Sequence, residues 1–112
     1  MILTRPLVSL DVETHAKCNP EQNRIVELGL RVDYPDGREP KRWCSLIDPG
    51  VPITASDVHG ITDADVAEKP TFAKLAPNLA HGLTYCDFSG YNVRFDLRVL
   101  QAEMDRTLVK WS

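Results

Sequence analysis

Two acidic residues stand two positions apart at the end of an apolar stretch near the start of the chain. The segment 7–13 is predicted as a β-strand, and Asp11 and Glu13 lie at its C-terminal end. Side chains at i and i+2 of a strand point to the same face, so both carboxylates project together. Two like charges this close repel each other unless a cation lies between them. Because oxygen ligands suit Mg²⁺ or Mn²⁺ rather than zinc, the pair predicts a divalent cation site.

Asp96 is a third candidate ligand, much later in the chain. It follows a short predicted strand at 87–91 and lies in the first turn of a helix predicted over 93–107. Asn92 stands where an N-cap side chain would hold the start of that helix. If the strand at 87–91 lies beside the first strand, Asp96 comes close to the two earlier carboxylates. In the alternative interpretation these acids have no catalytic role. Asp11 and Glu13 would be solvated at the start of a loop, and Asp96 would interact favourably with the helix dipole.

The rest of the chain must bring these segments together, and its patterns predict how. Apolar and polar residues alternate over 24–32, which indicates a strand with one buried face, and 42–47 supplies a third strand. Short capped helices are expected at 62–65 and from Thr71 onwards, the second of them kinked or split at Pro77. The order of three strands, helices, a strand and a helix predicts an α/β fold with a mixed sheet.

Composition bounds the class of protein. The 112 residues, 43% hydrophobic and 26% charged, predict one globular domain and exclude a disordered tail, a coiled coil and a collagen-like repeat. No apolar stretch is long enough to span a membrane, and the start of the chain lacks the features of a signal peptide. Three widely spaced cysteines indicate reduced thiols, so a cytoplasmic protein is expected. The net charge of −3 excludes nucleic-acid binding by basic charge alone.

Three motifs follow one another along the chain: Leu10-Asp11-Val12-Glu13-Thr14, Val58-His59-Gly60-Ile61-Thr62-Asp63 and Gly90-Tyr91-Asn92-Val93-Arg94-Phe95-Asp96. In this order they resemble the DEDD, or DnaQ-like, 3′→5′ exonuclease superfamily, which includes the proofreading (epsilon) subunit of DNA polymerase III. The resemblance covers about residues 7–105 and implies a ribonuclease H-like mixed sheet flanked by helices. The family's third motif, a His followed by an Asp, is absent. Residues 1–112 are therefore expected to form the N-terminal two-thirds of one exonuclease domain, without its last strand and helix.

The resemblance implies that nucleotides are removed from nucleic-acid 3′ ends by two-metal-ion hydrolysis of the phosphodiester. Asp11, Glu13 and Asp96 would be the catalytic residues and would hold two Mg²⁺ or Mn²⁺ ions. Two of the implied substrate contacts have alternatives: Asn92 could only cap its helix, and Phe95 could be a core residue. The implied substrate contacts are Val12, Thr14, His59, Asn92 and Phe95.

The expected partner is the 3′ end of single-stranded DNA, and a ribonuclease of the same fold acting on RNA is the alternative. A polymerase or a second copy of the chain is a further possible partner, and a membrane is not. Without the third motif, the chain could instead be an inactive relic that only binds metal and single strands. Loss of the last strand and helix would also expose an apolar patch on the sheet face carrying residues 7–12, which would favour self-association.

Overall fold

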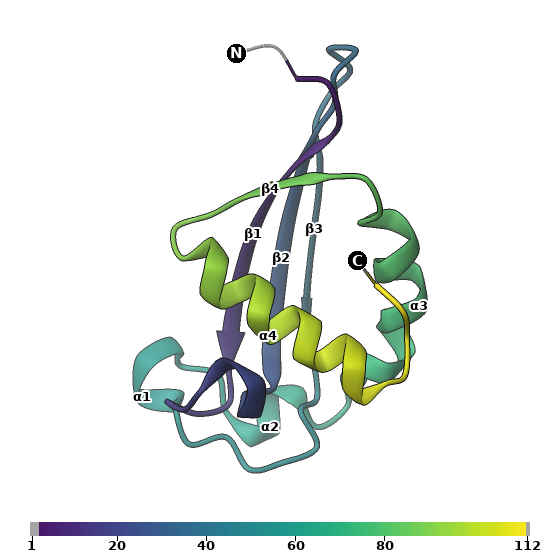
Figure 1. Cartoon of the computed structure of the whole chain (residues 1–112). Helices are drawn as coiled ribbons and strands as arrows, with labels where there is room; N and C mark the ends of the chain where they lie inside the picture. The colour runs from purple at the N-terminus through teal and green to yellow at the C-terminus, as the bar shows by residue number, and fades with distance from the viewer. Residues whose placement is uncertain (1–2, 112) are drawn as a thin grey trace.

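The computed structural model describes residues 3–111 and shows a four-stranded sheet with α3 and α4 on one face (Figure 1). The strand order is β3-β2-β1-β4. β1 pairs antiparallel with β2 and parallel with β4, and β2 pairs antiparallel with β3. The predicted α/β fold with a mixed sheet is therefore confirmed. The elements are β1 (Leu7–Thr14), the 3₁₀ turn η1 (Pro20–Gln22), β2 (Ile25–Asp33), β3 (Lys41–Leu46), α1 (Ser56–His59), α2 (Asp63–Val66), α3 (Phe72–Gly82), β4 (Asp87–Ser89) and α4 (Val93–Arg106).

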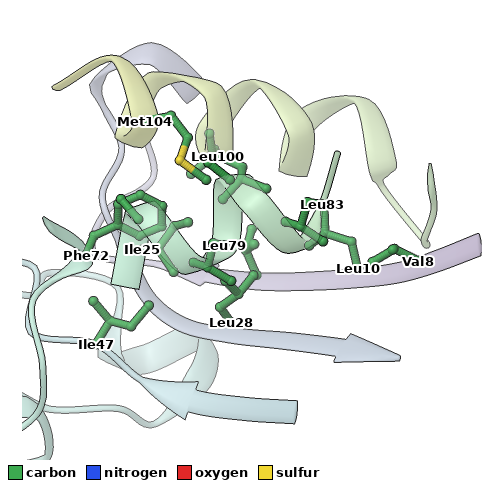
Figure 2. Packing of buried hydrophobic residues seen from close by; sticks show 14 residues of the cluster. Val8, Leu10, Ile25, Leu28, Ile47, Phe72, Leu79, Leu83, Leu100 and Met104 are labelled. Atoms are coloured by element: carbon green, nitrogen blue, oxygen red, sulfur yellow. The ribbon is translucent and has the colours of Figure 1, made fainter. Parts of the chain in front are cut away.

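The main core lies between the sheet and the helices α3 and α4 (Figure 2). On β1, Val8, Leu10 and Val12 are buried and the residues between them are not, as expected of a strand with one covered face. Leu100 and Met104 of α4 lie in the same core and are fully buried. Burying a side chain of this size contributes roughly 1.5–3 kcal/mol, so this packing holds α4 across β1.

β2 departs at its start from the alternation that the sequence predicts over 24–32. Its pairing with β1 shifts after Glu13, so that Thr14 lies opposite Ile25. This β-bulge places Ile25 in the main core and turns its neighbour Val26 into a second small cluster beside α2. The prediction of a single buried face was therefore wrong here, because the extra residue of the bulge lets both faces of β2 be covered at this end.

α3 is one helix of 11 residues that continues through Pro77, and a split into two pieces was wrong. A proline removes the hydrogen bond to the carbonyl four residues earlier, which here belongs to Ala73. Both residues are exposed, so water can bond the carbonyl that the proline leaves free.

β4 lies beside β1, as predicted, and α4 follows directly after it. Gly90 joins them where the chain passes so close to β1 that a Cβ would stand 2.5 Å from the carbonyl oxygen of Leu10. Only glycine fits this crossing. α4 ends at Arg106, and Leu108 just beyond it is 92% exposed. The backbone has left the helix there, since Leu108 has a φ of 60°.

The face of the sheet opposite the helices is polar. Strand alternation directs Ser9, Asp11 and Glu13 to this face, and Asp11 is exposed. The predicted apolar patch is therefore wrong, because β1 sends its buried apolar side chains to the helix side. Self-association stays a prediction. Over residues 3–111, no helix combines the length and the apolar character that crossing a membrane requires.

Candidate active site

β1 ends in the two carboxylates that the sequence singles out. Asp11 is exposed and Glu13 is half-buried, and Glu27 of β2 lies directly opposite Glu13. Burial raises the pKa of Glu13, and the charge of Asp11 adds to this rise. His59 lowers the pKa of Glu13, whereas Glu27 raises it further. Negative charge therefore accumulates at this end of the sheet.

Asp96 reaches the same region from the first turn of α4. It is 5% exposed, and its backbone N–H donates to the carbonyl oxygen of Asn92 at 3.0 Å. Burial raises the pKa of Asp96 to about 6, and the charges of Asp11 and Glu13 contribute to the rise. A hydrogen bond from the Val12 backbone opposes it. The crossover from β4 thus brings a buried carboxyl within electrostatic range of the pair on β1.

Salt bridges to these carboxylates are absent from the described part of the chain. Over residues 3–111, no Lys, Arg or His nitrogen lies within 4.0 Å of a carboxylate oxygen of Asp11, Glu13 or Asp96. Nor, in that range, do three His, Cys, Asp or Glu side chains already stand close enough to share one ion. The oxygen-only donors and their mutual repulsion fit a hard divalent cation. Binding would require the exposed Asp11 side chain and Glu13 to turn toward Asp96.

His59 is held by the backbone beside this cluster. Its Nδ1 accepts a hydrogen bond from the N–H of Ile61 at 3.0 Å, so the ring proton belongs to Nε2. Nε2 then donates to the carbonyl oxygen of Thr14 at 2.8 Å. The Thr14 hydroxyl donates to the carbonyl oxygen of Ala16 at 3.2 Å. His59 therefore also fastens α1 to the end of β1, and the Thr14 hydroxyl holds the loop that follows β1.

The remaining implied substrate contacts occupy three different environments. Val12 is buried and meets Asp96 through its backbone. Phe95 is half-buried and packs against the main core, which favours the structural interpretation. Asn92 is exposed at the N-cap position, but its side chain makes no capping hydrogen bond. The predicted cap was wrong, because only the backbone carbonyl of Asn92 bonds the first turn.

Glu103 on α4 is a further buried acid, 4% exposed, that was not among the predicted residues. Its Oε2 accepts a hydrogen bond from the N–H of Ile25 at 3.1 Å, and its Oε1 accepts one from Arg106 at 2.7 Å. Arg106 also donates to backbone carbonyls in and just after η1. This network ties the last turns of α4 to β2 and so holds Asp96 in position. The sequence signal that could have indicated Glu103 was its spacing of seven residues from Asp96, which puts both acids on one helix face.

Comparisons with known proteins agree with this fold. Residues 8–111 match the family model RNase_T, described as exonuclease. E. coli exonuclease I in complex with a dA16 oligonucleotide is similar at a TM-score of 0.76 and 21% identity, over 96% of this chain and 25% of that one. Cell-death related nuclease 4 is similar at a TM-score of 0.71 and 17% identity, over 93% of this chain and 40% of that one.

The chain thus spans about a quarter of the length of exonuclease I. No curated protein sequence matches it. Identities this low show likeness of fold alone, whereas the family model covers almost all of the chain.

Proposed function

Because the chain belongs to the DEDD, or DnaQ-like, exonuclease superfamily, we propose that it removes nucleotides stepwise from the 3′ ends of single-stranded DNA. The observation that carries the proposal is the approach of Asp96 on α4 to Asp11 and Glu13 at the end of β1. The similar fold of E. coli exonuclease I, whose structure holds a dA16 oligonucleotide, supports a single strand as the substrate.

In this proposal Asp11, Glu13 and Asp96 hold two divalent cations, Mg²⁺ or Mn²⁺. Bound there, the cations would supply a nucleophilic hydroxide and stabilise the charge that develops on the phosphodiester. Asp96 must be ionised to act as a ligand. Because its pKa is about 6, the ionised fraction of this carboxyl becomes large only near neutral pH. The hydrogen bond from the Val12 backbone favours that ionised form.

The surrounding residues would bind the terminal nucleotide. The Val12 backbone, Thr14 and His59 lie at the end of β1, and Asn92 and Phe95 lie at the start of α4. Both ring nitrogens of His59 are engaged with the backbone, so this residue would offer the face of its ring to the sugar or base.

A second candidate function is metal and strand binding without hydrolysis. The observation that favours it is the state of His59, whose Nδ1 already accepts a hydrogen bond and whose Nε2 donates one. It therefore has no free lone pair with which to activate water in this arrangement. A third candidate, an exoribonuclease of the same fold, differs only in the sugar of its substrate.

The test is cleavage of 5′-labelled single-stranded oligonucleotides in Mg²⁺ or Mn²⁺, read as a ladder of products. The proposal expects stepwise shortening from the 3′ end that stops in EDTA and falls about 10²-fold or more in Asp96→Asn. Asp105→Asn is the matched control, since Asp105 is an exposed acid on the same helix. Strand binding without shortening would favour the second candidate, and shortening of RNA alone would favour the third.

A further inference from the structure

One row of residues crosses the open face of all four strands beside the carboxylates. The pairing sets Ser89 of β4 against Ser9 of β1, Ser9 against Arg31 of β2, and Arg31 against Arg42 of β3. Residues paired in this way point to the same face of a sheet. The two serine hydroxyls confirm this, since their oxygens lie 3.2 Å apart. We call Ser89, Ser9, Arg31 and Arg42 the arginine row.

The row keeps two positive charges side by side in an acidic protein. Arg31 and Arg42 are both exposed and directly opposite each other, an arrangement that destabilises a strand pair. Oδ1 of Asp33 lies 3.1 Å from Nη2 of Arg31. Within residues 3–111, no carboxylate lies within 4.0 Å of Arg42. Asp33 thus pairs with Arg31 alone, and the unpaired charge of Arg42 is left for an external anion.

The arginine row lies two residues along β1 from the nearer carboxylate, Asp11. Ser9 precedes Asp11 by two residues, which is about 6.6–6.8 Å along a strand. The next row contains Gly29, which adds no side chain between Arg31 and the acidic end of β2. An extended single strand whose terminal phosphodiester lies at Asp11 could therefore place its next phosphates over the arginines.

We propose that the arginine row binds the phosphates of the substrate strand on the 5′ side of the scissile phosphodiester. Arginine suits this role, because its planar guanidinium group bonds two phosphate oxygens at once. The Ser9 and Ser89 hydroxyls share one hydrogen bond and keep one proton for a phosphate oxygen. The occupant is a single-stranded nucleic acid, and its position relative to the terminal phosphodiester rests on the function proposed above.

The test measures binding of a 5′-labelled single-stranded oligonucleotide by fluorescence anisotropy, in Ca²⁺ to avoid turnover, at several salt concentrations. Arg31→Ala and Arg42→Ala should each weaken binding about tenfold. The double variant should lower the slope of log K against log salt by about 1.4, which corresponds to two phosphate contacts on a single strand. Arg38→Ala is the matched control, because Arg38 pairs with Asp36 in the turn before β3.

Asp33→Asn tests the same idea in the opposite direction. It removes the carboxylate that competes for Arg31, so strand binding should tighten and the salt slope should steepen. A gain of affinity cannot come from a variant that merely fails to fold.

The outcomes separate this proposal from the function on which it rests. Unchanged affinity and slope in the double variant would overturn the arginine row, even if the wild-type chain shortens DNA. A loss of affinity in a chain that cleaves nothing would keep the row as a strand site and contradict the exonuclease. If an acidic peptide binds through the arginines more tightly than the oligonucleotide does, the occupant is wrong.

Discussion

α4 carries a buried carboxyl group near each end, and the partners of the two groups differ. Asp96 is 5% exposed in the first turn, and Glu103 is 4% exposed two turns later. Glu103 is neutralised by Arg106 and bonds the N–H of Ile25. Within residues 3–111, Asp96 meets only a backbone donor and faces the charges of two further carboxylates, which help to raise its pKa to about 6.

Glu103 thus helps to hold the fold together, whereas the carboxyl of Asp96 would need a cation from outside the chain. A buried carboxylate is costly unless it is paired within the chain or binds a cation. Glu103 follows the first course. Asp96 has no such partner within residues 3–111, and the function proposed above supplies a cation from outside.

The largest expected effect is the loss of stability in Glu103→Ala. This variant leaves Arg106 and the N–H of Ile25 without their partner, and it should lower the free energy of unfolding by about 3 kcal/mol. Glu103→Gln keeps an acceptor for Ile25 and should cost less. Urea denaturation monitored by circular dichroism measures both variants. Equal stability of Glu103→Ala and the wild type would contradict a structural role for this end of α4.

The next effect is the dependence of stability on pH that Asp96 produces without metal. Its pKa rises from an ordinary value of 3.8 to about 6 in the fold, so the contribution is fully present below pH 3.8 and is lost as the pH rises through 6. The free energy of unfolding should therefore fall by about 2 kcal/mol between roughly pH 4 and pH 7.

Asp96→Asn should flatten this part of the profile, and divalent cations should reverse it because they bind the ionised form. Denaturant midpoints across this range, with EDTA or with Mn²⁺, measure the effect. A profile that is the same in the wild type and in Asp96→Asn would show that burial does not perturb this carboxyl.

The smallest effect concerns the cap of α4. Asn92 makes no side-chain capping bond, so Asn92→Ala should change stability by only a few tenths of a kcal/mol. Thr62 is the comparison, because it forms a capping box with Asp65 at the start of α2, and Thr62→Ala should cost about 1 kcal/mol. Thermal unfolding of the two variants measures the loss of stability in each. Equal losses would mean that Asn92 caps its helix in solution.

Local pattern was enough to predict the elements that carry the carboxylates. The apolar run of β1, the acids Asp11 and Glu13 at its end, and Asp96 in the first turn of α4 are all within a few residues of their expected places. These features depend on strand alternation and helix starts, which are written in consecutive residues. The family resemblance added that the segments lie in the order of a known fold.

Contacts between distant segments could not be predicted in the same way. The buried Glu103 accepts a hydrogen bond from the N–H of Ile25 beside the bulge, and neither partner can be predicted from its own neighbours in sequence. The register that sets Arg31 opposite Arg42 is likewise fixed by strand pairing. Acids and arginines on helices and strands are usually solvated, so their types alone predict exposure.

The most direct test of the contrast between the ends of α4 is Mn²⁺ binding, measured from the electron paramagnetic resonance signal of the free ion. Wild-type protein and Glu103→Gln should bind Mn²⁺ with similar affinity. Asp96→Asn should bind at least about tenfold more weakly, since it removes one charged ligand. Equal binding by the wild type and Asp96→Asn, or a loss confined to Glu103→Gln, would contradict the assignment of Asp96 as the carboxyl that awaits a cation.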